Sequence, residues 1–122
     1  ALRAVAHESR LGLDKVKEFI VEFVASQWQH SMLASVPDLL AGIRGNMLMV
    51  KFVDSARIIW ACESYISEIC AHKTIPEWRI LDTLADALSS VDYYLERYLE
   101  DSAGSHEMIL HAAMSTVAEL GL

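Results

Sequence analysis

The sequence predicts an all-α protein that folds as an antiparallel bundle of four long helices with one additional helix. Apolar residues recur at helical spacing along the chain, and no stretch keeps the two-residue alternation of a strand. The 122 residues are 53% hydrophobic and 22% charged, which suits one domain with its own core and excludes a disordered chain. Connections of about three to six residues favour antiparallel packing of successive helices. We therefore expect residues 1–122 to form a single helical-bundle domain.

The first two helices are expected over residues 2–29 and 36–50. Gly12 either kinks the first helix or marks its start. The apolar stripe of the first helix consists of Val16, Phe19, Ile20, Phe23 and Val24. Ahead of the second helix, the run Ser-Val-Pro-Asp at 35–38 is a capping signal, since it supplies a hydroxyl, a first-turn proline and an acid three residues later.

The third helix is expected over residues 54–72, and a fifth follows Gly104. Between them, the run Thr-Ile-Pro-Glu at 74–77 repeats the capping chemistry and opens a fourth helix that ends near residue 100. The fourth helix carries the apolar stripe Leu81, Leu84, Leu88, Val91, Leu95 and Leu99. The fifth helix carries Ile109, Ala112, Ala113, Val117 and Leu120. The tryptophans are expected to pack in the core or at its rim, at Trp28, Trp60 and Trp78.

The charge balance excludes several classes of partner. Seventeen acidic residues against 10 Lys and Arg give a formal charge of -7, which argues against binding to nucleic acid or to an anionic membrane. The mean hydropathy is +0.26, yet no window supplies the roughly 20 apolar residues of a membrane span, so we expect no membrane insertion. Cys62 and Cys70 lie about 12 Å apart along one helix and cannot form a disulfide, which fits a reducing cytoplasm. Without an initiator Met or signal peptide, the chain reads as a cytoplasmic fragment of a longer protein.

No residue pattern predicts an enzyme site, a metal site or a cofactor. His106 and His111 are five residues apart, whereas zinc-protease helices need two His four apart on one face. The five glycines are scattered singly, so no phosphate-binding loop is present. Asp82 and Asp86 share a helix face that we interpret as solvated. The two cysteines are interpreted as small core residues rather than nucleophiles. We therefore expect no catalytic residue, no metal and no cofactor.

The second helix has an unusual solvent face. At about 100° per residue, its apolar residues cluster on the core side. That cluster consists of Val36, Leu39, Leu40, Ile43, Met47 and Val50. The opposite side carries Ala41, Arg44, Gly45 and Leu48. A mid-helix glycine costs about 1 kcal/mol relative to alanine, a cost that makes sense where a partner approaches closely. The alternative is that the glycines are incidental.

Residues 41–45, Ala-Gly-Ile-Arg-Gly, resemble the His-x-Leu-Lys-Gly motif of histidine phosphotransfer (Hpt) domains, helical bundles that exchange phosphoryl groups with receiver domains. The resemblance implies a bundle of the Hpt type. Arg44 matches the cation beside the phosphoryl site and Gly45 matches the glycine that leaves room for it. Ala41 stands where active members carry the phosphorylated His. A methyl group has no lone pair to accept a phosphoryl group, so the resemblance implies a non-catalytic pseudo-Hpt domain.

A wider resemblance covers residues 43–50, 61–66, 84–96 and 118–122. These segments are similar to the N-terminal region of CheA-type hybrid histidine kinases that govern type IV pili, a region shared with scaffold proteins of the FimL type. Both parents remain open. The resemblance implies a docking or scaffold module in chemosensory signalling that controls type IV pili and twitching motility. Its implied partner is a response-regulator receiver domain or another pilus chemosensory protein, bound through Ala41, Arg44, Gly45 and Leu48.

Two alternatives remain at this stage. His30 begins a second run that resembles a phosphotransfer motif, which would make the domain active. This run lacks the cation and the glycine, and Pro37 follows within two helical turns, where it interrupts helical geometry. The third hypothesis is a structural module that forms a homodimer through its surplus apolar surface. The docking hypothesis instead predicts a monomer or weak dimer.

Overall fold

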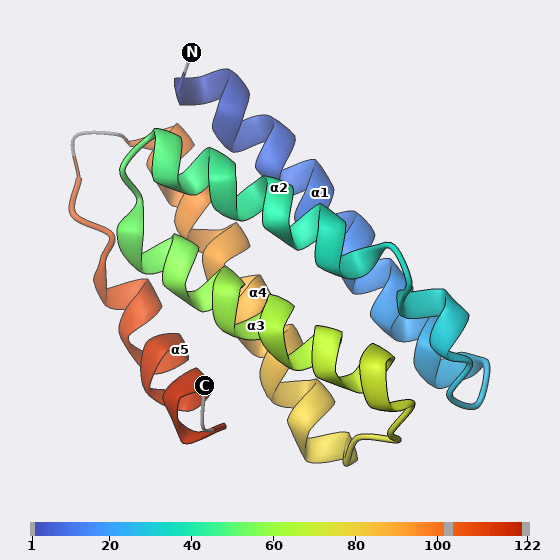
Figure 1. Cartoon of the computed structure of the whole chain (residues 1–122). Coiled ribbons are helices and arrows are strands. Elements are labelled where there is room, and N and C mark those ends of the chain that lie inside the picture. The colour runs from blue at the N-terminus through green and yellow to red at the C-terminus, as the bar shows by residue number, and fades with distance from the viewer. Residues whose placement is uncertain (1, 102–103, 121–122) are drawn as a thin grey trace.

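The computed structural model describes residues 2–101 and 104–120, and it confirms the all-helical fold (Figure 1). The helices are α1 (Leu2–Ala25), α2 (Val36–Met49), α3 (Val53–His72), α4 (Trp78–Glu100) and α5 (Met108–Glu119), with a short 3₁₀ helix, η1 (His30–Leu33), between α1 and α2. In the part of the chain that the structure describes, every helix is too short or too polar to cross a membrane.

Helices α1 to α4 form an up-and-down ring in which each helix packs against its chain neighbour and α4 returns to pack against α1. The fifth helix packs against α4 and α3 (Figure 1). Its buried residues are Leu110, Ala113 and Val117, whereas Ala112, expected in its stripe, is exposed. The predicted stripes of α1 and α4 do enter the core. The fully buried side chains of the core include Leu13, Phe23, Leu40, Met47, Ile58, Ile59, Leu84, Leu88 and Leu95.

The first helix ends at Ala25, so the predicted end at residue 29 is wrong. Gln27 takes a left-handed conformation with φ of 58°, and the amide of Trp28 donates to the carbonyl oxygen of Phe23 at 2.9 Å. This six-to-one bond is the mark of a Schellman cap. The Trp28 ring then packs edge-on against Phe23, with centroids 5.4 Å apart, which is the apolar contact that accompanies such a cap.

The predicted side-chain caps of the second and fourth helices are absent. Ser35 precedes α2 and Glu77 precedes α4, and neither side chain caps its helix with a hydrogen bond. Thr74, the expected cap of the fourth helix, lies in the loop before it. Pro37 does occupy the first turn of α2, where its fixed φ suits a helix start.

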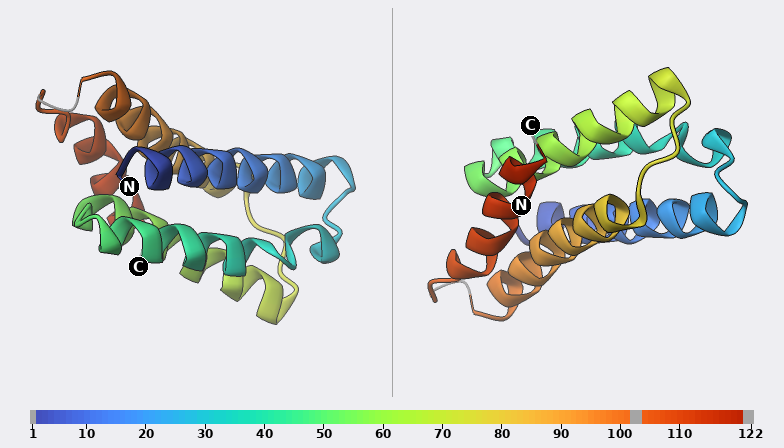
Figure 2. Two further views of the ribbon diagram at one scale, coloured as in Figure 1. Left: turned by 90° about the horizontal axis from the view of Figure 1, so that it is seen from above. Right: turned by 90° about the horizontal axis from the view of Figure 1, so that it is seen from below.

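Gly12 lies inside α1, which continues through it, so the glycine does not mark the start of the helix. Helices α1 and α2 lie side by side (Figure 2), and Gly12 is a point of close approach between them. A Cβ built at Gly12 would lie 3.0 Å from Cδ1 and 3.2 Å from Cγ1 of Ile43, the buried residue at the middle of α2. Because interiors are close-packed, this contact leaves little room for an added methyl group. Gly12 therefore sets the packing of α1 on α2.

We expect Gly12→Ala to stabilise the domain less than Gly42→Ala. Both positions are helical, so each alanine gains about 1 kcal/mol in helix propensity. At Gly42 a Cβ meets nothing within 4 Å, whereas at Gly12 it presses on Ile43. Urea unfolding measures both free energies. Equal gains in the two variants contradict a tight contact, and Ile43→Val should raise the gain at Gly12 alone.

Candidate functional site

The outward side of α2 follows from how its inward side is buried. Val36, Leu40, Ile43 and Met47 are buried as predicted, while the flanking Leu39 and Val50, also expected in the core, are only half-buried. On the opposite side, Ala41 is partly exposed, Gly45 is exposed and Leu48 is 51% exposed. The structure thus places the motif residues of α2 together on one accessible side of the helix.

Arg44 does not project freely into solvent, because it pairs with an acid of the neighbouring helix. Its Nε donates to Oε1 of Glu63 on α3 at 2.9 Å, and its Nη2 lies 3.5 Å from Oε2. The side chains of Arg44 and Glu63 are 33% and 18% exposed. This forked pair fixes the guanidinium over the α2–α3 seam. Any acidic partner that binds Arg44 therefore competes with Glu63.

A second residue of α3, Trp60, adds to this surface. Trp60 precedes Glu63 by one turn on α3, and Leu48 follows Arg44 by one turn on α2. Because α2 and α3 run antiparallel (Figure 1), positions 48 and 60 both lie one turn from the ion pair towards the connection between the two helices. Trp60 is 47% exposed, which is unusual for so large an apolar residue. We call the set Ala41, Arg44, Gly45, Leu48, Trp60 and Glu63 the motif face.

The glycines of α2 face open space. A Cβ at Gly42 or at Gly45 meets nothing within 4 Å, so neither glycine is required by packing inside the described chain. Gly45 lies on the motif face, whereas Gly42 lines a shallow hollow shared with α1. The two positions therefore form a matched pair, alike in helix context but on different surfaces.

His30, the alternative phosphorylation site, has a geometry that gives this role no support. It begins η1 rather than standing in the middle of a long helix. Its Nε2 lies 2.6 Å from the carbonyl oxygen of Thr74, and because a carbonyl only accepts, Nε2 carries the proton. Its ring packs edge-on against Phe23, with centroids 5.3 Å apart. Nε2 is thus engaged in joining η1 to the loop before α4, and Nδ1 alone keeps a lone pair.

The described residues bring no set of metal ligands together: among residues 2–101 and 104–120, no three His, Cys, Asp or Glu side chains cluster. His106 lies before α5, where its Nε2 is 2.8 Å from the Asp101 carbonyl oxygen, while His111 is an exposed residue of α5. The cysteines are packing residues, as predicted. Burial raises the pKa of the Cys62 thiol to about 12, and burial also raises the pKa of the half-buried Cys70, partly offset by Lys73.

We expect iodoacetamide at pH 8 to alkylate Cys70 slowly and to leave Cys62 untouched in the folded protein. Only the thiolate reacts, and both thiols titrate above their ordinary range, Cys62 far above it. Peptide mass mapping after timed alkylation measures each site, with the urea-unfolded protein as the control in which both react. Native alkylation of Cys62 at the rate of Cys70 contradicts the burial of that side chain.

A family model described as the FimL C-terminal domain matches residues 1–117. Among curated proteins, the chain is similar to the scaffold protein FimL of Pseudomonas aeruginosa, with 31% identity over 119 residues. This alignment covers 97% of the chain but 21% of the relative, so the chain spans about a fifth of that protein's length. No solved structure matches the chain. The sequence left a hybrid kinase and a FimL-type protein open as parents, and the family match is to the FimL type. The matching domain is described as C-terminal in FimL, whereas the expected resemblance was to an N-terminal region.

Proposed function

Because the chain belongs to the FimL C-terminal domain family, we propose that it is a non-catalytic, Hpt-like docking module in chemosensory signalling that controls type IV pili and twitching motility. The printed name of the relative, a scaffold protein, supports a role in holding other proteins rather than in catalysis. The proposed partner is a response-regulator receiver domain, because receivers are what the exposed helix face of active Hpt domains binds.

The observation that carries this proposal is the position of Ala41. It lies on the accessible side of α2, three residues before Arg44, where the resemblance to Hpt domains puts the phosphorylated His. A methyl group cannot accept a phosphoryl group, but it also adds no bulk that would block a receiver. The domain therefore keeps the docking surface of a phosphotransfer protein while lacking its chemistry.

The motif face has the composition of a docking surface. Leu48 and Trp60 supply exposed apolar area, and a large aromatic residue is a common energetic anchor of an interface. Arg44 lies one turn before Leu48 on α2 and offers a charge to the acidic pocket of a receiver. Glu63 holds this charge in the free domain, so receiver binding must exchange one ion pair for another. This exchange makes the role of Glu63 measurable.

We expect Glu63→Gln to strengthen binding of pilus response-regulator receivers and Arg44→Met to weaken it. Removing the competing carboxylate frees the guanidinium, and an ion pair near the surface is worth up to about 1 kcal/mol, or roughly fivefold in affinity. Calorimetric titration of each receiver into the chain measures the change. Glu68→Gln is the matched control, because it removes the same charge from a different, exposed face of α3.

Resonance shifts in the same titrations locate the contact. The docking assignment requires the amides of Gly45 and Leu48 to shift with saturation. If Glu63→Gln and Glu68→Gln change the affinity equally, the effect is one of net charge and the exchange of ion pairs is wrong. If another surface shifts while the motif face stays unchanged, the proposed site is wrong.

We expect Gly45→Ala to stabilise the domain yet weaken receiver binding. A methyl group at position 45 meets nothing in the free chain, so the gain in helix propensity, about 1 kcal/mol, is retained. The same methyl group lies where the partner must approach α2. Thermal unfolding and titration measure the two effects, and Gly42→Ala is expected to give the same stability gain with unchanged binding. Equal binding by both variants contradicts a close approach at Gly45.

A further inference from the structure

The seam between α1 and α4 is closed along one half and open along the other. In the closed half, Nε of Arg10 pairs with Asp92 at 2.9 Å, and Nζ of Lys17 lies 3.6 Å from the same carboxylate. Arg3 adds a hydrogen bond to the carbonyl oxygen of Leu99 at 3.1 Å. Beyond Lys17 towards the end of α1, no ion pair or side-chain hydrogen bond joins the two helices among the described residues. The α1 residues that line this open half are all apolar: Ile20, Val21, Val24 and Ala25.

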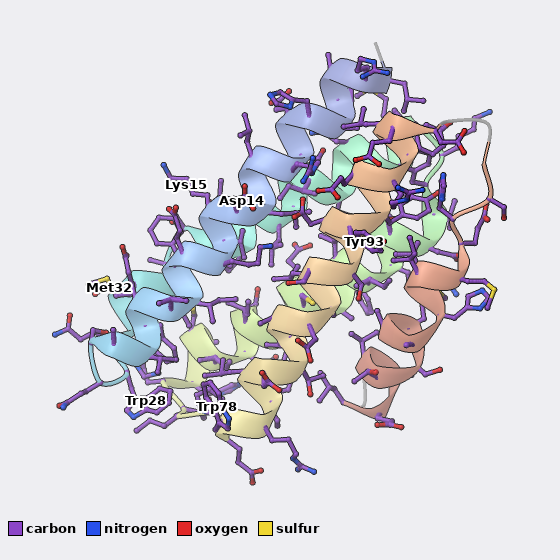
Figure 3. All side chains as sticks on the ribbon, turned by 180° about the vertical axis from the view of Figure 1, so that it is seen from behind. Asp14, Lys15, Trp28, Met32, Trp78 and Tyr93 are labelled. Carbon is purple, nitrogen blue, oxygen red and sulfur yellow. The ribbon has the colours of Figure 1, made fainter. Side chains whose placement is uncertain are left out.

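This open half is hollowed into an apolar groove of about 300 Å³. Ala25 and Ala85 are too small to fill the seam, so Ile20 and Leu81 form its floor. The walls are Val21 and Trp78, which are 65% and 67% exposed. Figure 3, which looks onto α1 and α4, shows Trp78 at the beginning of α4, at the end of the bundle where α1 terminates. Two such exposed side chains beside an unfilled groove mark a surface built to be covered.

One acid, Asp82, lines the groove, and three more acids lie near it on the same two helices. Glu18 and Glu22 lie one turn before Val21 and Ala25 on α1, and Asp82 and Asp86 lie one turn apart on α4. All four are exposed, and none forms an ion pair within residues 2–101 and 104–120. Two of the nearby cations are paired, since Lys17 pairs with Asp92 in the closed half and Arg79 lies 3.4 Å from Glu77. Lys15, one turn before Glu18 on α1, is an exposed cation near the same acids. Within the described part of the chain, the groove therefore offers apolar contact with four acids nearby against the single unpaired cation Lys15.

We propose that this groove binds a basic amphipathic helix of a protein partner. Two or three apolar side chains spaced at i, i+3 or i+4 and i+7 fill the groove over roughly 10 Å, about two helical turns. Flanking Lys or Arg side chains pair with Glu18, Glu22, Asp82 and Asp86. A second copy of this chain is disfavoured because it carries a net charge of -7 and brings the same acids against the rim. An anionic membrane is repelled for the same reason.

The test uses a designed 18-residue helical peptide that carries Leu at positions i, i+3 or i+4 and i+7, facing the groove, and Lys on both sides of this stripe. The peptide is titrated into the ¹⁵N-labelled chain. The Lys peptide is expected to shift the amides of Val21, Ala25 and Ala85. Its counterpart with Glu in place of Lys is expected to bind at least tenfold more weakly. Trp78→Ala is expected to lower the affinity for the Lys peptide at least fivefold. The double variant Asp82→Asn, Asp86→Asn is expected to lower that affinity and to make it less dependent on salt concentration.

Trp60→Ala is the matched control, because it removes an exposed tryptophan from the motif face on another seam of the bundle. This variant should leave peptide binding unchanged while weakening receiver binding, and Trp78→Ala should do the reverse, so the two proposals fail separately. Equal binding of the Lys and Glu peptides, or shifts confined to another surface, overturns the basic-helix proposal. If the chain self-associates with concentration in sedimentation experiments and Trp78→Ala abolishes this self-association, the groove binds a second copy and the basic-helix proposal is also overturned.

Discussion

The close packing of Ile43 against Gly12 decides which side of α2 faces solvent. Once Ile43 is buried against α1, the helical period turns Arg44 towards α3 and leaves Gly45 and Leu48 outward. A rotation of α2 by one residue would bury Arg44 without its partner, which is costly for a charge. The proposed docking surface is thus a consequence of core packing, because its residues lie where the apolar stripe of α2 leaves them.

Most of the fold could be predicted from the sequence because helical stripes report burial directly, as those of α1, α2 and α4 do. The end of the first helix was harder, since it was expected at residue 29 and lies at Ala25, whereas α2 ends at Met49, one residue before its expected end. Gln27 and Lys51 take left-handed conformations at the caps of α1 and α2, where glycine or asparagine would usually announce the end. Each cap is stabilised instead by the next residue, Trp28 or Phe52, packing back on the core. Propensities of single residues cannot predict such a cap, because tertiary packing offsets the cost of a left-handed conformation at a residue other than glycine.

The candidate site was predictable for one helix and not for its neighbour. The period of α2 placed Ala41, Arg44, Gly45 and Leu48 on one side, and the structure agrees. The period of α2 could not predict that Glu63 pairs with Arg44, because pairing across α2 and α3 depends on how the two helices are aligned. A Glu and an Arg 19 residues apart carry no signal of contact until the antiparallel packing is known.

The positions of the motif face and the apolar groove within the ring bear on what a scaffold must do. The motif face lies over the α2–α3 seam and the groove over the α1–α4 seam, and these are opposite seams of a ring closed by α1 and α4 (Figures 1 and 3). A partner on one seam therefore leaves the other uncovered. Holding two proteins together requires two surfaces that can be occupied at once. If both proposals hold, a cation on one face and acids beside the groove on the other let the bundle discriminate between two partners by charge.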